Sequence, residues 1–490
     1  MSIIAAYVVP HPPLIVPAIG GSREQEISHT IAAYQEVARR IAKATPDTLV
    51  ISSPHTEMYL DYLHIAGGTR AQGTFAQFGA SCEGSSVTYD HEFVRELCQL
   101  AQTAQLPAGT AGERDPSLDW GVLVPLHFIQ AAWEEVHPGT VTHFHGLPQL
   151  PCKVVRMGLS GLSPEDHYRM GMLVQQVAQK LGRRVVYVAS GDLSHKLAAD
   201  GPYGFAPEGP LFDDLACDVF RTGDFLKLLT ADPSMCERAA ECGLRSFQIM
   251  AGALDRTPIA AELLSHEGPF GVGYGVAAFT PTGPTGSDIS RAFEDQYLAW
   301  HTKEMQHLRH SESPLVQLAR FTLERYVREG KRTNPQRDLP EDLLNNLPDE
   351  LFHTRAGAFV SLKKNGQLRG CIGTILPTRS NLAEEICANA ISAGTHDPRF
   401  SAVETSELDE LVYDVDVLST PERISSPDEL DPARYGVIVS TPDGRRGLLL
   451  PDLDGVNTVD EQLSIAARKG GIDLADSNIQ LERFTVTRYV

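Results

Sequence analysis

The chain has 490 residues, which is too many for one ordinary core. Of these residues, 42% are hydrophobic and 21% are charged, a composition typical of globular proteins. We therefore expect two or more domains. The formal net charge of -21 at pH 7 argues against nucleic acid or an anionic membrane surface as a partner, because phosphate groups bind basic surfaces.

The sequence also indicates a compartment. No apolar run is long enough to cross a bilayer, and the N-terminal residues lack the basic flank and cleavage pattern of a signal peptide. The eight cysteines include no Cys-x-x-Cys pair, so we expect reduced, mostly buried thiols and neither a disulfide framework nor a structural zinc site. These features predict a cytoplasmic protein.

The first predicted elements are two buried strands that each end in a histidine. Residues 3–9 are apolar and stop at a Pro-His-Pro-Pro sequence that contains His11. Prolines fix φ and hold this ring in one place, which suits a ligand better than a packing residue. A helix is predicted over 22–44, and the second strand, 48–53, leads into Pro-His at His55.

Helices and strands then alternate, which predicts an α/β sandwich with its ligands at the strand ends. A third apolar strand, 184–189, is followed by Ser-Gly-Asp-Leu-Ser-His and ends at His195. Three strand-end histidines in one domain indicate a metal site. The other elements expected in this domain are helices near 91–104, 165–181, 211–220 and 233–255, and strands near 154–159, 259–264 and 271–279.

Residues 281–287 are rich in proline and glycine and form the clearest boundary. We therefore predict an N-terminal domain over 1–280, a linker and bridging helix over 281–312, and a C-terminal α+β domain over 313–490. In this last domain we expect helices at 314–329 and 382–393, and strands at 357–363, 411–418, 436–440 and 447–450.

Two histidines and one carboxylate on one face of an ion leave open positions for substrate and dioxygen, as in non-haem Fe(II) oxygenases. His11 and His55 supply the nitrogens. Glu241, at the start of an apolar helical run, is the best candidate for the carboxylate, and Glu267 is its competitor. A solvated carboxylate stabilised by the helix dipole is the alternative interpretation of Glu241. His195 is then expected to transfer protons, since its unperturbed pKa lies near neutrality.

The Pro-His-Pro-Pro opening, the Ser-Pro-His after the second strand, Ser-Gly-Asp-Leu-Ser-His and a closing Gly-Val-Gly-Tyr-Gly-Val together resemble the class III extradiol ring-cleavage dioxygenase catalytic subunit and its relatives, which include the Memo proteins. The resemblance covers about residues 1–280. It implies Fe(II) bound by His11, His55 and Glu241, with His195 as catalytic acid/base. It also implies insertion of O2 into a catechol-like or aminophenol-like aromatic substrate.

Two departures from the pattern leave alternatives open. Many extradiol enzymes carry Asp-His-Gly where this chain has Trp120, so His127 is a substitute candidate for substrate binding and Trp120 a candidate pocket wall. Cys242, beside Glu241, matches a Cys-Gly of Memo-type relatives and is the alternative ligand. A thiolate favours a Memo-type metal-binding or redox role without ring cleavage, and Zn or Cu in place of Fe(II). Two histidines and a carboxylate also suit hydrolytic zinc.

The C-terminal run Leu-Arg-Gly-Cys-Ile-Gly, with Asp-Pro-Arg-Phe at 397–400, resembles the AMMECR1 domain over roughly 313–490. Gly370 and Gly373 allow close backbone approach, and Arg369 can hold an anion. Cys371 is reactive if it is exposed near Arg369 or His396. A tight packing motif with a buried thiol is the other interpretation. A homodimer is the expected oligomer for a soluble enzyme.

Overall fold

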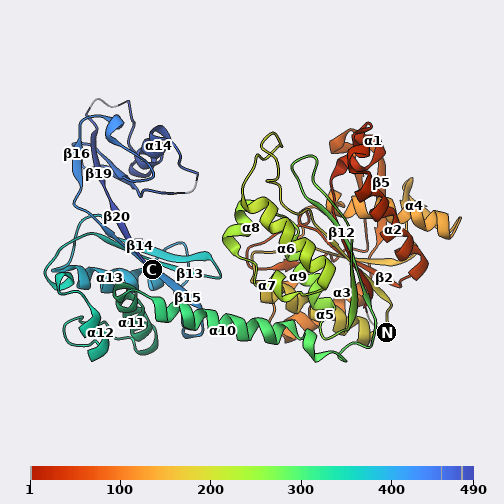
Figure 1. The fold of residues 1–490 in the computed structure, drawn as a ribbon, viewed down its shortest axis with the longest axis horizontal. Coiled ribbons are helices and arrows are strands. Elements are labelled where there is room, and N and C mark those ends of the chain that lie inside the picture. The colour runs from red at the N-terminus through yellow and green to blue at the C-terminus, as the bar shows by residue number, and fades with distance from the viewer. Residues whose placement is uncertain (1–2, 454, 476–477) are drawn as a thin grey trace. The chain divides into compact units, whose positions relative to one another are not determined.

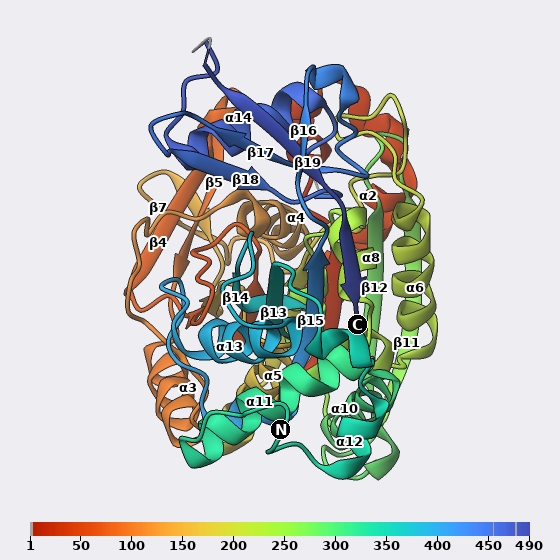
Figure 2. The same cartoon turned by 90° about the vertical axis from the view of Figure 1, so that its left-hand side faces the viewer.

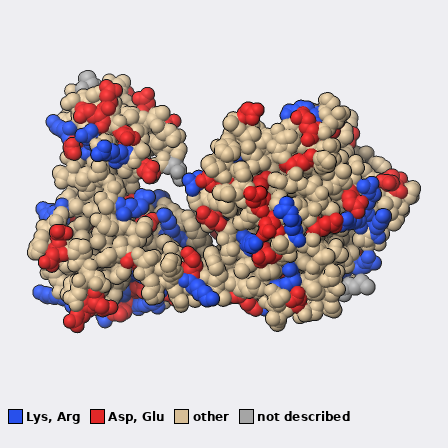
Figure 3. All heavy atoms as spheres, in the orientation of Figure 1, with Lys and Arg blue, Asp and Glu red and all other residues tan. Residues whose placement is uncertain are grey.

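The computed structural model describes residues 3–453, 455–475 and 478–490. The chain divides into two units, Met1–Trp300 and His301–Val490 (Figure 1). Helix α10 (Phe293–Ser311) runs across this division, where the sequence predicts a bridging helix. None of the helices in the described part of the chain has both the length and the apolar character of a transmembrane span. Acidic and basic side chains are interspersed on the face shown in Figure 3.

The first unit is built on a six-stranded sheet with the order β11-β12-β1-β10-β2-β9. The four strands β1, β10, β2 and β9 are parallel, and the two at the other edge are antiparallel. Their bounds are β1 (Ile3–Val9), β2 (Thr48–Ser52), β9 (Lys153–Met157), β10 (Val185–Ser190), β11 (Ile259–Glu267) and β12 (Tyr274–Pro281).

Helices cover both faces of this sheet, which confirms the predicted α/β sandwich. Successive residues of β1 point into separate cores, Val8 into one and Val9 into the other. The core that contains Val8 also includes residues of α3 (His91–Thr103), α5 (Pro164–Lys180), α6 (Glu208–Thr222) and α9 (Leu244–Ala253). The opposite core includes residues of α2 (Ser28–Ala44) and α4 (Trp120–Val136).

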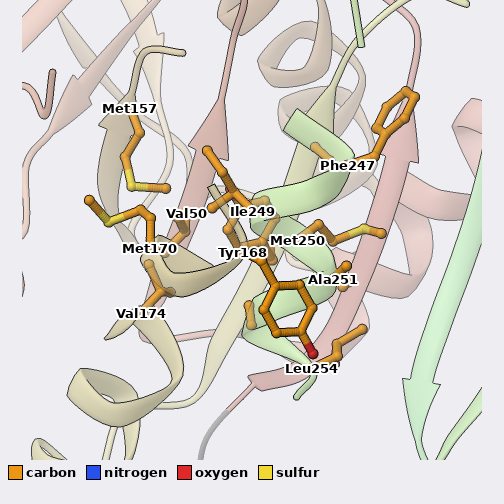
Figure 4. Packing of buried hydrophobic residues seen from close by; sticks show 14 of the residues in the cluster. Val50, Met157, Tyr168, Met170, Val174, Phe247, Ile249, Met250, Ala251 and Leu254 are labelled. Atoms are coloured by element: carbon orange, nitrogen blue, oxygen red, sulfur yellow. The ribbon is translucent and has the colours of Figure 1, made fainter. Parts of the chain in front are cut away.

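Helix α9 packs closely on α5. Figure 4 shows Tyr168 of α5 beside Met250 and Ala251 of α9. A Cβ atom on Gly252 would lie 1.8 Å from the backbone oxygen of Tyr168, so only glycine permits this approach.

The remaining elements of the first unit are short. A two-stranded sheet pairs β3 (Leu63–His64) with β6 (Ala108–Gly109), and a four-stranded sheet has the order β4-β5-β8-β7. The bounds of its strands and of three short helices are β4 (Arg70–Phe75), β5 (Ala80–Thr88), β7 (Thr142–Phe144), β8 (Leu147–Gln149), α1 (Pro17–Gly20), α7 (Leu226–Leu229) and α8 (Pro233–Ala239).

One element of the first unit differs from the sequence prediction. Residues 233–255 were expected to form one helix, but α8 ends at Ala239 and α9 begins at Leu244. Ala240 adopts a left-handed conformation with φ of 51°, which stops α8. This break places Glu241 and Cys242 in a short connection and not within a helix.

The second unit has the predicted α+β composition and two sheets, with the orders β14-β13-β15-β20 and β16-β19-β17-β18. Helices α11 and α13 pack on the first sheet (Figure 2) and α14 on the second. The bounds are α11 (Pro314–Glu329), α12 (Glu341–Asn346), β13 (Ala358–Lys364), β14 (Gln367–Gly373), α13 (Leu382–Thr395), β15 (Leu411–Leu418), β16 (Glu422–Ile424), β17 (Gly436–Ser440), β18 (Arg446–Leu449), α14 (Val459–Gly470), β19 (Gln480–Phe484) and β20 (Val486–Tyr489).

Candidate metal centre

The carboxyl ends of β1, β10 and β2 meet at one edge of the main sheet, because these neighbouring strands are parallel. His11 follows β1, Asp192 and His195 follow β10, and His55 follows β2. The Nε2 atoms of His11 and His55 lie 3.0 Å apart. The structure therefore brings together the two histidines that the sequence predicts as nitrogen ligands.

His11 is held in one orientation and one tautomer. Its side chain is buried, and its backbone N–H donates to Asp192 Oδ1 at 2.8 Å. Its Nδ1 lies 3.0 Å from the hydroxyl of Ser190, which itself donates to the carbonyl oxygen of Gly121. Because that hydroxyl proton is already used, we assign the proton of His11 to Nδ1. The Nε2 lone pair then faces His55, as a metal ligand requires.

His55 is fixed by its neighbours on both sides. Its ring stacks on the indole of Trp120, with centroids 3.9 Å apart. Asp119 accepts a hydrogen bond from the hydroxyl of Ser53 at 2.6 Å and another from Thr56 at 2.7 Å. The carboxylate of Asp119 thus binds one residue before His55 and one residue after it, and so restrains the segment that carries this ring. The sequence reasoning did not identify Asp119 in this role.

The protonation of the two histidines suits a metal ion. Burial lowers the pKa of His11 to about 3 and the pKa of His55 to about 4, so both rings are neutral at pH 7. Two ligand nitrogens about 2.1 Å from one ion and at right angles to each other are about 3 Å apart. The observed separation of 3.0 Å matches that arrangement.

Two further donors lie beside His11 Nε2. Asp192 Oδ2 is 3.9 Å and Cys242 Sγ is 3.8 Å from this nitrogen. Among the described residues, His11, Asp192 and Cys242 form the group of potential metal ligands whose donor atoms all lie within 4.8 Å of one another. Burial raises the pKa of Asp192 to about 6 and raises that of Cys242 well above its usual value. A bound cation would favour the ionised form of both groups.

The two carboxylates proposed from the sequence have other partners. Glu241 Oε2 accepts the backbone N–H of Leu244 at 2.7 Å, so this side chain caps the start of α9. Burial raises the pKa of Glu241. Glu267 Oε2 accepts both the N–H and the hydroxyl of Thr30 at 2.7 Å. The coordination of a metal by Glu241 stays a prediction, while the geometry favours Cys242 and Asp192.

His195 lies on the same strand end as Asp192. Its backbone N–H donates to the carbonyl oxygen of Ala239 at 3.0 Å, and its ring meets that of Tyr203 edge to face. Its Nδ1 atom is buried and has no hydrogen-bond partner among the described residues. The acid/base role of His195 stays a prediction.

A cavity of about 620 Å³ adjoins His55, and Trp120 also contributes to its lining. His127 instead lines a separate cavity of about 400 Å³, with Arg39 and Glu135. His127 follows Trp120 by seven residues on the same helix and therefore lies about 10 Å further along the axis. The structure does not bring it to the cavity beside His55.

The second-unit motif lies on β14 and is engaged in packing. Arg369 forms two hydrogen bonds of 2.9 Å with the carboxylate of Glu407, so its charge is already paired and the predicted anion site is not free. A Cβ on Gly370 would lie 2.2 Å from a carbonyl oxygen of α13, and one on Gly373 would meet the ring of Phe359 at 2.1 Å. Both glycines make the predicted close approach.

Cys371, the thiol of this motif, has several polar neighbours. Its backbone N–H donates to Asp397 Oδ2 at 2.9 Å, and Ser361 lies with its hydroxyl 3.2 Å from the sulfur. Arg399 donates to both Asp397 oxygens and to the carbonyl oxygen of Cys371. The ring of His396 lies 2.7 Å from the hydroxyl of Thr395. These contacts agree with a packing motif.

Two family models match the chain. The model described as the catalytic LigB subunit of aromatic ring-opening dioxygenase matches residues 5–277. The AMMECR1 model matches residues 316–489. These matches agree with the two resemblances seen in the sequence and cover most of each unit.

Relatives match the whole chain or a part of it. Protein CA_C1420 of Clostridium acetobutylicum is 37% identical over 499 residues, which cover 100% of this chain and 99% of that protein. A Thermotoga maritima protein is 54% identical over 179 residues, 36% of this chain and 98% of its own length. Neither name states an activity.

Two solved structures of uncharacterized proteins also match. Protein PH0010 of Pyrococcus horikoshii has a TM-score of 0.32 and 32% sequence identity, and the match covers 36% of this chain and 89% of that one. Protein JW3007 of Escherichia coli K12 has a TM-score of 0.38 and 13% identity, with coverage of 56% and 99%.

Proposed function

The chain belongs to the family of the catalytic LigB subunit of aromatic ring-opening dioxygenase and carries an AMMECR1 domain, and from this premise we propose that it is a metal-dependent oxidoreductase. The metal ion would be bound in the first unit, at the carboxyl ends of β1, β2 and β10. The second unit has no assigned reaction in this proposal.

The observation that carries the proposal is that three further donors lie within 4 Å of His11 Nε2. His11 and His55 present neutral nitrogens 3.0 Å apart, and Cys242 Sγ and Asp192 Oδ2 lie 3.8 and 3.9 Å from the first of these nitrogens. We assign His11, His55 and Cys242 as ligands and Asp192 as a fourth donor. Two nitrogens, a sulfur and an oxygen suit iron, copper or zinc, and only the first two change oxidation state readily.

A redox-active ion bound here would activate dioxygen and lower the proton affinity of a bound hydroxyl group. The chain's own groups prepare the site for that chemistry. Trp120 and Asp119 hold His55 in place, and Ser190 fixes the tautomer of His11. His195, on the same strand end as Asp192, would accept a proton from a substrate hydroxyl and return it later.

Cys242 favours a Memo-type redox or metal-binding protein as the finer function. A thiolate is a softer ligand than a carboxylate and supports copper binding or redox chemistry of the sulfur itself. Glu241, which an iron-dependent ring-cleaving site would use, instead caps α9. This geometry gives the Memo-type alternative its support.

Extradiol ring cleavage is the second candidate, and the cavity beside His55 favours it. Its volume of about 620 Å³ is large enough for a small aromatic molecule, and Trp120 contributes an aromatic side chain to its lining. In that case Fe(II) would be bound by His11, His55 and Glu241, and the substrate would be a catechol-like or aminophenol-like aromatic with O2. A change in the connection between α8 and α9 would be needed to turn Glu241 toward the histidines.

The test begins with metal-free protein titrated under anaerobic conditions with Fe(II), Cu(I) and Zn(II), with bound metal measured by mass spectrometry. Oxygen uptake over a panel of catechols and aminophenols follows for each loaded form. Uptake with the Fe(II) form supports ring cleavage. Stoichiometric Cu or Fe binding that Cys242→Ala abolishes, without uptake on any substrate, supports the Memo-type function. Cys82→Ala, at an exposed cysteine, is the matched control, and failure to bind any of the three metals would contradict the proposal.

A further inference from the structure

The segment that joins β10 to the following loop is fixed along its whole length. It carries Asp192 and His195, and every backbone N–H from residue 191 to residue 196 donates a hydrogen bond. The acceptors, in chain order, are Val9 O, Cys242 Sγ, Gly273 O, Asp213 Oδ1, Ala239 O and Ser194 Oγ, at 2.8–3.3 Å. Two of these acceptors are side chains that come from other elements, Cys242 and Asp213.

Asp213 lies on α6 and is 2% exposed. Its Oδ1 accepts the backbone N–H of Ser194 at 2.9 Å, and its Oδ2 lies 2.7 Å from Nε2 of His266 on β11. The hydrogen bond from His266 to Asp213 raises the pKa of this histidine to about 10, so the ring is charged at neutral pH and balances the buried carboxylate. One oxygen of the Asp213 carboxylate therefore pairs with His266, and the other accepts the N–H of Ser194.

Gly273 also binds this segment, through two backbone hydrogen bonds. Its N–H donates to the carbonyl oxygen of Ser194, and its own carbonyl accepts the N–H of Leu193, both at 2.8 Å. A Cβ atom at position 273 would lie 2.1 Å from Asp213 Oδ2. The carboxylate of Asp213 thus occupies the space that a side chain at position 273 would fill. Its position therefore requires glycine at residue 273.

We propose that Asp213 is a positioning residue for the metal centre: its carboxylate, anchored by His266, fixes Ser194 and through it the placement of Asp192 and His195. Asp213 does not contact the metal ligands themselves. The role rests on the proposed function, because it gives Asp192 and His195 their places at the metal site. Groups that orient ligands from outside the coordination sphere typically change metal affinity by about 10- to 100-fold when they are replaced.

Asp213→Asn is the first test variant. Asparagine has one acceptor oxygen, so it can accept from Ser194 or from His266 but presents an N–H group to the other. Gly273→Ala reaches the same contact from the opposite side, because its methyl group displaces the carboxylate of Asp213. Asp218→Asn is the matched control, since Asp218 lies on the same helix, is exposed and pairs with Lys227 at 2.6 Å.

The measurement is a titration of metal-free protein with Co(II), whose visible absorption reports ligand type and geometry. We expect Asp213→Asn and Gly273→Ala to bind Co(II) about tenfold more weakly or worse and to show shifted absorption bands, while Asp218→Asn matches the wild type. A purely structural role would lower thermal stability but leave the spectrum of the loaded protein unchanged. Wild-type affinity and spectrum in both test variants would overturn the inference.

Hydrogen exchange in the metal-free protein separates this inference from the proposed function. If the wild type binds no Co(II), the proposed metal site fails, and exchange of the amides of residues 192–195 then decides the positioning claim. Faster exchange in Asp213→Asn supports it, and unchanged exchange overturns it. If neither buried variant folds, they are replaced by His266→Ala, at a partly exposed position. An unchanged Co(II) spectrum together with unchanged hydrogen exchange in that variant also overturns the positioning role of Asp213.

Discussion

His11 and His55 follow different strands, yet their Nε2 atoms lie 3.0 Å apart at the edge of the main sheet. The Ser190 hydroxyl oxygen accepts a hydrogen bond from Nδ1–H of His11, so the lone pair on the opposite nitrogen faces the second ring. Two neutral imidazoles in this arrangement, one buried and one half-buried, provide room for one shared proton or for a cation. This arrangement therefore predicts that both histidines contribute to metal binding, which single substitutions can test.

His11→Ala and His55→Ala should each lower the affinity for Fe(II), Cu(I) or Zn(II) by at least about 100-fold, because each variant removes one of two nitrogen ligands. Equilibrium dialysis followed by metal analysis measures the effect. His29→Ala, at an exposed position on α2, should bind like the wild type. Retention of wild-type affinity in either site variant would show that the two rings meet for another reason.

Cys242→Ala and Glu241→Gln should behave differently although the residues are adjacent. The first variant removes a sulfur 3.8 Å from His11 Nε2 and should lose most metal binding, together with the thiolate absorption of the Co(II) form. The second keeps an oxygen that can accept the N–H of Leu244 and should keep the metal. Loss of metal in Glu241→Gln with retention in Cys242→Ala would instead identify the carboxylate as the ligand and favour ring cleavage.

The convergence of the histidines was predictable because parallel neighbouring strands deliver their carboxyl ends to one edge. Apolar runs with clear ends reveal such strands, and the prolines around His11 and before His55 mark where they stop. Asp192 was equally visible two residues after β10, in the sequence that also contains His195. The sequence-based prediction does not include Asp192 as a donor, because it assigns a role in this motif only to His195, as an acid/base.

The third ligand was not predictable in the same way. The run from 233 to 255 has largely helical spacing, and Gly243 is a local sign of a break, three residues after Ala240, which adopts the left-handed conformation at a φ of 51°. With this turn, Cys242 approaches His11 while Glu241 caps α9. A local break signal does not tell which of two adjacent side chains will face a histidine more than 230 residues away in the chain.

The two ligand histidines should make the metal-free protein sensitive to acid. Burial lowers the pKa of His11 to about 3 and that of His55 to about 4, below their ordinary value of 6.5. Between pH 6.5 and pH 4 the unfolded chain binds protons that the folded protein excludes, so the free energy of unfolding rises with pH in this window and is lost as pH falls.

Urea denaturation of the metal-free protein at about pH 7.5 and about pH 5 measures this loss, with the double variant His11→Gln/His55→Gln as the comparison. The wild type should lose more stability than the double variant over this interval. Burial raises the pKa of Asp192 to about 6, so this group titrates in the opposite sense and reduces the net loss in the wild type. Equal losses in the two proteins would show that the histidines are not protected from protons in the fold.

Asp397→Ala should destabilise the second unit. Strand β14 is at the edge of its sheet, and Asp397, which is 4% exposed, accepts the backbone N–H of Cys371 at 2.9 Å in place of a neighbouring strand. Its removal leaves that N–H and the guanidinium of Arg399 without their carboxylate, at a cost of about 1–3 kcal/mol. Thermal and urea unfolding measure the change. Asp409→Ala removes an exposed carboxylate of the same unit that pairs with Arg309 at 3.1 Å, and it should cost well under about 1 kcal/mol. Equal stability of the two variants would mean that the carboxylate does not protect this edge of the sheet.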